Sequence, residues 1–277
     1  MRRLTVASMF AGIGGICLGF KQSGYDIVWA NEIDKSACQT YRYNFGDSYL
    51  VEGDVRAIDA ISLLDFDVLT AGFPCQSFSI GGAQKGFGDN RGVLFFEVSR
   101  IIDAKRPKVV LLENVENLIE HDEGRTFLAI YNVLAQYGYS VRYKIMPSNE
   151  YGNVPQARKR IYIIAFLDIT KCDEFQFPKP IPLTSTIADI VDKSERKHDI
   201  YYYEETTPLH SKINTFIGKS GRLFRVYNGN IRNLRNLNLA PTLTASMNAA
   251  YNAIVLRDNY GIATDPARVA KFAGVWE

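Results

Sequence analysis

Short apolar runs of seven or eight residues recur along the first part of the chain. They are rich in Val and Ile, and segments with helical spacing of apolar residues separate them. The runs cover residues 4–10, 26–33, 67–73, 108–115 and 160–167. Between two of them, Leu94, Val98 and Ile101 fall on one helical face, and Pro107 precedes the next run. This alternation predicts an α/β fold with a doubly wound, mostly parallel sheet.

The alternation ends near Asp168, and a different composition follows. Three prolines occur between residues 178 and 182, and Asn, Gly, Arg and Tyr dominate afterwards. Residues 211–257 hold seven basic residues and no Asp or Glu, although the net charge of the whole chain is only +2. A solvated surface usually mixes both signs, so this segment favours a surface that faces a polyanion. We predict a large domain over residues 1–169 and a second, smaller domain over 170–262.

Composition excludes several classes of protein. Hydrophobic residues make up 47% of the chain and charged residues 22%, and no apolar run approaches the ~20 residues of a membrane span. The first residues resemble a strand and turn more than a signal peptide, which predicts a cytoplasmic protein without a membrane segment. Four cysteines lie far apart and three histidines are scattered, so we expect neither a metal site nor a disulfide framework.

Residues whose side chains or backbone could serve a ligand site lie at the ends of the first four apolar runs. A glycine-rich turn follows the first run, Glu32 closes the second, Cys75 follows the third after "GFP", and Glu113 closes the fourth. Ligands of open parallel sheets bind outside the carboxyl ends of the strands. Glycines beside acidic residues there favour a site for a nucleoside-bearing cofactor, although any tight turn also favours glycine.

Four motifs in order, "FAGIGG", "GFPCQSFS", "ENV" and "QARKR", resemble the cytosine-5 DNA methyltransferase family of bacterial restriction-modification systems. The resemblance covers about residues 4–261. It implies S-adenosylmethionine as cofactor and a flipped-out cytosine of double-stranded DNA as substrate. It also implies that the smaller domain recognises the target sequence.

The catalytic residues make chemical sense of this resemblance. Carbon 5 of cytosine is too electron-poor to attack a methyl sulfonium, but a thiolate that adds to carbon 6 makes carbon 5 nucleophilic. Cys75 is the candidate thiolate, although a free cysteine more often fills a core. The ring charge then needs a partner at nitrogen 3, which the resemblance assigns to Glu113. It assigns Arg160 to the base carbonyl, with Arg158 and Gln156 in support; a surface charge cluster is the competing interpretation.

The resemblance also implies a cofactor site. Glu32 would bind the ribose, Ile33 would cover the adenine, and Asp54 would accept the adenine amino group. Turns, helix caps and core packing are the alternative roles of these residues. The full predicted set is Phe10, Gly12, Gly14, Gly15, Glu32, Ile33, Asp54, Pro74 and Leu94.

DNA contacts are predicted in two places, the glycine-rich segment after Cys75 and the basic segment over residues 211–257. Residues 80–92 hold five glycines, a composition typical of a lid that could fill the space of an extruded base; a plain surface loop is the alternative. The predicted DNA-binding residues are Ser79, Gln84, Lys85, Arg222, Arg225 and Thr242, the last by resemblance of "APTLTAS" to a family segment.

Two further interpretations stay open at this point. The same motifs fit a tRNA cytosine-5 methyltransferase, and a catalytically incompetent DNA-binding remnant or subunit would keep the fold. Residues 263–277 do not continue the family pattern, whereas a shifted reading frame does. From this we expect an aberrant tail and low activity of the chain alone, unless a second polypeptide supplies the missing motifs.

Overall fold

The structure is a computed structural model. It describes residues 2–74, 93–186, 189, 215, 224–227, 230–233, 239–241 and 253–255. The chain divides into two compact units, each described by itself below. The first comprises Met1–Met146 and Lys159–Pro178, and the second comprises Pro147–Arg158 and Lys179–Glu277. The domain boundaries predicted from composition remain predictions.

The first unit is built around a sheet whose strands alternate with helices along the chain. Its strands are β1 (Thr5–Met9), β2 (Asp26–Glu32), β3 (Leu50–Glu52), β4 (Val68–Ala71), β5 (Val109–Val115), β6 (Ser140–Pro147) and β8 (Lys159–Phe166). Its helices are α1 (Gly15–Gln22), α2 (Lys35–Phe45), α3 (Val93–Lys105), α4 (Arg125–Gln136) and α6 (Ile169–Glu174), with short 3-10 turns η1 (Val55–Ala57) and η4 (Glu116–Leu118).

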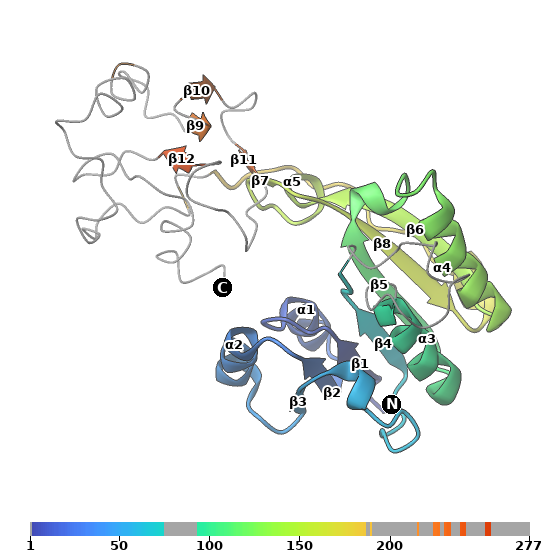
Figure 1. The fold of residues 1–277 in the computed structure, drawn as a ribbon. Helices are drawn as coiled ribbons and strands as arrows, with labels where there is room; N and C mark the ends of the chain where they lie inside the picture. Colours follow the sequence, from blue (N-terminus) through green and yellow to red (C-terminus); the bar gives the residue numbers. More distant parts are fainter. Residues whose placement is uncertain are drawn as a thin grey trace. The chain divides into compact units, whose positions relative to one another are not determined.

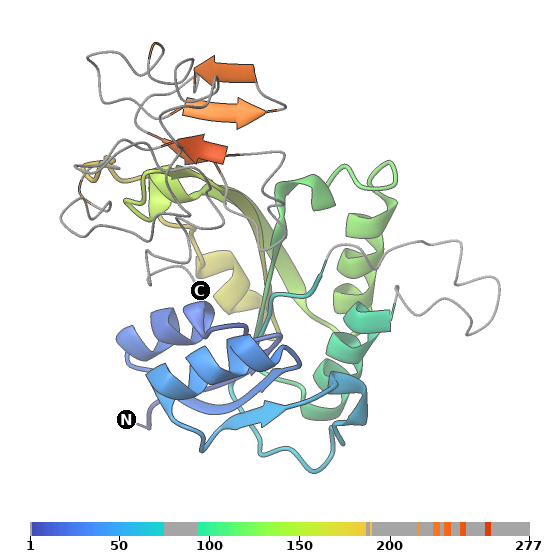
Figure 2. The same ribbon diagram turned by 60° about the vertical axis from the view of Figure 1, so that its left-hand side comes forward.

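The order of strands across the sheet is β3-β2-β1-β4-β5-β8-β6 (Figures 1 and 2). The pairs β1–β2, β1–β4, β2–β3 and β4–β5 are parallel, which confirms the predicted mostly parallel α/β sheet. The sheet is not parallel throughout, because β8 runs antiparallel to β5. Its first residues therefore lie beside the last residues of β5, and Arg160 pairs with Val115.

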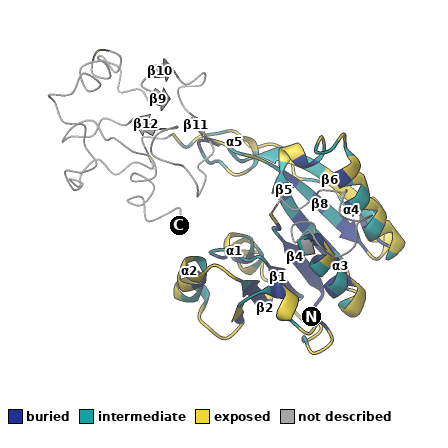
Figure 3. Ribbon diagram, viewed as in Figure 1, coloured by how far each residue is buried: buried dark blue, intermediate teal, exposed yellow. Residues whose placement is uncertain are grey.

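Helices cover both faces of the sheet (Figures 1 and 2). On one face, residues such as Ala7, Met9 and Leu69 pack against α3 and α4 in the larger hydrophobic cluster. On the other face, Val6, Ile27 and Val68 pack with residues of α1 and α2 in a second cluster. Successive residues of β1 such as Val6 and Ala7 therefore pack on opposite faces of the sheet, because side chains alternate along a strand. Figure 3 shows the burial of the central strands.

Sequence patterning missed two strands of the sheet. The strand β3 has only three residues, of which Val51 and Glu52 are exposed. The strand β6 contains no fully buried residue and mixes polar with apolar positions. Neither has the buried apolar run that marks the central strands, because both lie at the two ends of the strand order.

Asp67 closes the amino edge of the sheet, where the parallel strands begin. Its side chain is only 5% exposed. It accepts hydrogen bonds from the Thr5 N–H at 2.9 Å and the Thr5 hydroxyl at 3.1 Å, and it pairs with Arg2 at 3.0 Å and Lys108 at 2.8 Å. Thr5 opens β1, Asp67 precedes β4 and Lys108 precedes β5, so this carboxylate ties three strands together.

The second unit contains short elements. They are α5 (Ser148–Tyr151), β7 (Gln156–Ala157), β9 (Phe224–Tyr227), β10 (Asn230–Asn233), β11 (Ala240–Pro241) and β12 (Ala253–Val255). The strand β9 pairs antiparallel with β10 and β12, and β7 pairs parallel with β11. Within the described part of both units, no helix combines the length and apolar character that a membrane crossing requires.

Candidate active site

A cavity of about 430 Å³ opens at the carboxyl ends of the first four strands. It lies at the point where the strand order reverses. From β1 the chain builds outward on one side through β2 and β3, and it then returns to place β4 on the other side of β1. Such switch points are the usual ligand sites of open α/β sheets. The lining residues are Phe10, Asn31, Glu32, Ile33, Gly53, Asp54, Val55, Arg56, Gly72, Pro74 and Leu94. Six of these, Phe10, Glu32, Ile33, Asp54, Pro74 and Leu94, belong to the set predicted from the sequence.

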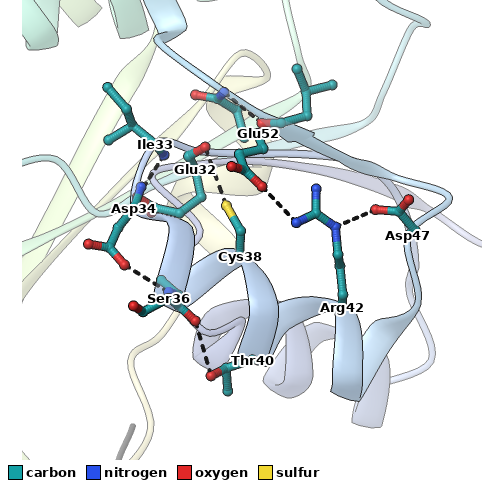
Figure 4. A network of polar contacts seen from close by, with 12 residues as sticks. Glu32, Ile33, Asp34, Ser36, Cys38, Thr40, Arg42, Asp47 and Glu52 are labelled. Atoms are coloured by element: carbon teal, nitrogen blue, oxygen red, sulfur yellow. Dashed lines mark hydrogen bonds and ion pairs between the residues drawn. The ribbon is translucent and has the colours of Figure 1, made fainter.

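Glu32 joins the loops that follow β1 and β2. One carboxylate oxygen accepts the Gly12 N–H at 2.8 Å. The other accepts the Ile33 N–H at 2.8 Å and the Asp34 N–H at 2.9 Å. Figure 4 shows Glu32 at the entry to α2, where Asp34 caps the helix by accepting the Ala37 N–H. The three backbone donors hold the carboxylate at the cavity wall with lone-pair capacity for further donors.

The loop after β1 depends on unusual backbone conformations. Phe10, Gly12 and Gly14 have φ values of 53°, 56° and 93°. An ideal Cβ on Gly14 would lie 2.3 Å from Cε2 of Phe45, so the α2 side chain occupies the space that a larger residue would need. The predicted glycines Gly12, Gly14 and Gly15 do not line the cavity themselves. They shape the loop that presents Phe10 and donates to Glu32.

Asp54 and Arg56 form a charged pair at the cavity wall. The Arg56 Nε lies 2.9 Å from both Asp54 oxygens, and its Nη2 also donates to Oδ2. Hydrogen bonds from the Arg56 side chain and N–H hold the pKa of Asp54 below its usual value. Sequence analysis missed Arg56, and also the buried Asn31, whose side-chain amide donates to the Gly53 carbonyl at 2.9 Å. The available signals were the place of Arg56 two residues after Asp54 and the place of Asn31 directly before Glu32.

Glu113 and Arg160 meet at the ends of β5 and β8. The Arg160 Nε lies 2.9 Å from Glu113 Oε1, and their side chains are 16% and 21% exposed. An ideal Cβ on Gly72 would lie 3.5 Å from Glu113 Oε2, so this carboxylate lies next to a residue that lines the cavity. The buried Asn114 donates to the Phe73 carbonyl at 2.9 Å and thereby fixes the backbone just before Pro74.

The remaining predicted residues are either outside the described residues or in the second unit. Cys75, Ser79, Gln84, Lys85, Arg222 and Thr242 are outside the described residues. Arg158 and Gln156 belong to the second unit, where the Arg158 carbonyl accepts from Ser148 N–H at 2.8 Å. Arg225 lies on β9 and pairs in register with Arg232 on β10.

The chemistry of the cavity fits a nucleoside-bearing ligand. Two carboxylates can accept hydroxyl and amino donors, and Phe10, Leu94 and the 62%-exposed Ile33 offer apolar surface for a ring. No group of three or more His, Cys, Asp or Glu residues that could hold a metal ion occurs among the described positions.

Comparison with known proteins agrees with this chemistry. A family model described as "C-5 cytosine-specific DNA methylase" matches residues 4–267. The chain is 43% identical over 263 residues to Type II methyltransferase M.Bsp6I of Bacillus sp. (strain RFL6), covering 94% of this chain and 83% of that protein. It is 39% identical over 235 residues to Type II methyltransferase M.HhaI of Haemophilus parahaemolyticus, covering 81% and 71%.

Solved structures share the fold. The Entamoeba histolytica methyltransferase EhMeth is similar with a TM-score of 0.65 at 21% identity, over 100% of this chain and 87% of that one. The S. pombe Dnmt2 methyltransferase is similar with a TM-score of 0.59 at 22% identity, over 89% and 79%.

Proposed function

The chain belongs to the C-5 cytosine-specific DNA methylase family, and we propose that it methylates carbon 5 of a flipped-out cytosine in double-stranded DNA through a covalent adduct with Cys75. Membership of a methyltransferase family implies a reaction that depends on S-adenosylmethionine. The observation that carries the proposal is the cavity at the switch point of the sheet, with the Glu113–Arg160 pair beside it.

The lining of the cavity supports a cofactor role for the predicted residues. S-adenosylmethionine supplies an electrophilic methyl group when it is bound. Glu32 would accept hydrogen bonds from the ribose hydroxyls with the lone pairs that its three backbone donors leave. Asp54 would accept from the adenine amino group. Ile33, Leu94 and Phe10 would exclude water from the apolar faces of the cofactor.

Cys75 would act as the nucleophile. Its thiolate adds to carbon 6 of cytosine, and the ring electrons shift so that carbon 5 becomes nucleophilic. Transfer of the methyl group to carbon 5 would leave S-adenosylhomocysteine as the second product, and loss of the carbon 5 proton to a base then supplies the electron pair that re-forms the double bond between carbons 5 and 6. The carbon 6–sulfur bond then breaks, and the thiolate leaves. Asn114 supports this role because it fixes the Phe73 carbonyl two residues before Cys75.

Glu113 and Arg160 would stabilise the ring while Cys75 is attached. A carboxyl at Glu113 can donate a proton or hydrogen bond to nitrogen 3 as charge builds there. The Arg160 guanidinium keeps that carboxyl in place through the 2.9 Å contact and can donate to the base carbonyl with its other N–H groups. Arg158 and Gln156 would support this part of the site.

A trapping experiment tests the proposal. The purified chain is incubated with S-adenosylmethionine and duplex DNA that carries 5-fluorocytosine, because fluorine at carbon 5 blocks the last elimination and preserves the adduct. A covalent complex should form with the wild type and with Cys172→Ser, which changes a buried cysteine on α6. It should be absent with Cys75→Ser. A complex that survives Cys75→Ser would overturn the assignment of the nucleophile.

The substrate class is tested in parallel. Tritiated S-adenosylmethionine is supplied with duplex DNA or with tRNA, and incorporated label is counted. We expect label in DNA, with weaker transfer at higher salt because basic contacts release counterions. Label in tRNA alone would replace DNA as the proposed substrate.

A further inference from the structure

We propose that Arg56 is a positioning residue that sets the specificity of the cavity for a purine with an amino donor at carbon 6. The inference rests on the proposed function, because it concerns how Asp54 would recognise the nucleoside of S-adenosylmethionine. Arg56 lines the cavity but belongs to none of the motifs that the sequence brought out.

The backbone on both sides of Asp54 is fixed. Before it, the Gly53 carbonyl accepts the Asn31 side-chain amide at 2.9 Å. After it, the Val55 carbonyl accepts Arg100 Nη2 at 3.2 Å, and the Val55 side chain is 3% exposed in the larger hydrophobic cluster. Arg100 is itself held by Glu97, whose Oε2 lies 2.8 Å from Arg100 Nε. The main chain at Asp54 is therefore anchored, and its side chain is the remaining degree of freedom.

Arg56 removes that freedom. The Asp54 carboxylate receives three donors from this one residue, namely the backbone N–H at 2.9 Å, Nε–H shared between the two oxygens, and Nη2–H. A carboxylate offers about four lone-pair positions. Among the described residues, no donor besides those of Arg56 reaches the Asp54 carboxylate, so about one acceptor position remains for a ligand.

This arrangement has a consequence for selectivity. An aspartate is ionised at neutral pH, and hydrogen bonds from Arg56 hold the pKa of Asp54 below its usual value, so this carboxylate can accept but not donate a hydrogen bond. An adenine amino group can use the remaining position. A purine with a carbonyl at carbon 6 cannot, because two acceptors would face each other.

The planar fork of arginine is needed for the parallel contacts to both oxygens. Lysine keeps the charge but offers a point donor on a flexible stem. Arg56→Lys should therefore retain part of the effect, and Arg56→Ala should lose it. A matched control is Arg42→Ala, since Arg42 also bridges two carboxylates, Asp47 at 2.5 Å and Glu52 at 2.7 Å, but does not line the cavity (Figure 4).

The experiment measures binding by isothermal titration calorimetry of the full chain with S-adenosylhomocysteine and with S-inosylhomocysteine, whose purine has a carbonyl at carbon 6. Releasing one ordered side chain weakens binding about 3- to 10-fold. We expect this loss in Arg56→Ala for S-adenosylhomocysteine only, a smaller loss in Arg56→Lys, and none in Arg42→Ala. In an Asp54→Asn background, Arg56→Ala should have no further effect on S-adenosylhomocysteine.

Two results overturn the inference and are distinguishable from each other. Equal losses for both ligands, or no loss for either, would show that Arg56 does not act through Asp54 on the amino group, while the cofactor site itself would stand. A wild-type chain that does not bind S-adenosylhomocysteine at all would overturn the proposed cofactor site and the inference with it.

Discussion

Carboxylates are used in opposite ways at the amino edge of the central sheet, where the parallel strands begin, and at its carboxyl edge, where they end. At the amino edge, Asp67 is 5% exposed and receives its donors from Thr5, Arg2 and Lys108. At the carboxyl edge, Glu32 and Asp54 line an open cavity, and Glu113 lies beside Gly72 with 21% of its side chain exposed. The first carboxylate joins strand ends, whereas the others face space that a ligand can enter.

The difference shows what makes a carboxylate available for chemistry. Asp67 is surrounded by two cations and by Thr5, which satisfy its lone pairs from within the fold. Glu32 is held by backbone N–H groups that fix its position and leave capacity toward the cavity. We therefore expect substitutions at the amino edge to change stability, and substitutions at the carboxyl edge to change binding and turnover.

The largest effect is expected for Glu113→Gln. This substitution keeps the size of the side chain but removes the carboxyl that would supply a proton to the base, so the rate of DNA methylation should fall about 10²- to 10³-fold. The free energy of unfolding should change by only about 1 kcal/mol, because a glutamine oxygen can still accept the hydrogen bond from Arg160 Nε. Single-turnover methylation and chemical denaturation measure the two quantities. Methylation within a factor of three of the wild type would break the contrast between the edges.

Glu32→Gln should have the next largest effect and should weaken both ligand binding and the stability of the fold. An amide offers one acceptor oxygen, so its NH₂ would face one or more of the backbone N–H groups that the carboxylate now accepts. We expect S-adenosylhomocysteine to bind about 10- to 100-fold more weakly and the protein to lose about 1–2 kcal/mol of stability. Glu52→Gln is the control, since Glu52 pairs with Arg42 outside the cavity (Figure 4). Equal binding by Glu32→Gln and wild type would remove Glu32 from the site.

The pattern of apolar residues predicted the central strands of the sheet, which are buried on both faces. The central strands appear as apolar runs because both of their faces pack against helices, as Val6 and Ala7 do. The direction of β8 could not be predicted in this way, because an apolar run is the same in a parallel and an antiparallel strand. The short β3 and the half-exposed β6 carry too little burial to form a run.

The candidate site was predictable where a motif marked it and not where geometry alone created it. Phe10 and Glu32 lie at the ends of apolar runs, the family resemblance assigned Asp54 to the cofactor site, and all three line the cavity. Asn31 and Arg56 also line it, but their contribution depends on contacts that the sequence does not reveal. Arg56 acts on a residue only two positions away, whereas Asn31 reaches β3 and the Gly53 carbonyl across the sheet.

Asp67→Asn tests the amino edge. Burial alone would raise the pKa of Asp67, but hydrogen bonds from Lys108 and Thr5 outweigh it and lower the pKa from 3.8 to about 2. A carboxylate with a lowered folded-state pKa stabilises the fold fully above its unfolded pKa, and this contribution is lost as pH falls toward about 2. We expect Asp67→Asn to lose about 2 kcal/mol at pH 7, with S-adenosylhomocysteine binding unchanged.

Urea denaturation at several pH values checks this prediction. The difference between wild type and Asp67→Asn should be constant from about pH 6 to 8 and should shrink below about pH 4. Asp65→Asn is the matched control, because the Asp65 side chain is 93% exposed and pairs with Lys105 at 3.2 Å. Its loss should be below about 0.5 kcal/mol. Equal losses for the two variants would refute a special role for the amino edge.

The smallest effect is expected for Tyr41→Phe. Tyr41 lies on α2 against Phe45, whose ring packs beside Gly14 in the loop after β1. Tyr41 is fully buried, its ring stacks on Phe45 at 4.7 Å, and its hydroxyl donates to Cys17 Sγ at 3.6 Å. Burial raises the pKa of Tyr41, so the hydroxyl stays protonated and the effect should not depend on pH between 6 and 8. A thiol is a weak acceptor that tolerates the loss of a donor, so phenylalanine should cost less than about 1 kcal/mol.

Tyr139→Phe should cost more, because its hydroxyl donates to the Pro107 carbonyl at 2.6 Å. Thermal unfolding of both variants measures the difference, and equal losses would mean that the thiol holds the tyrosine as firmly as a buried carbonyl does.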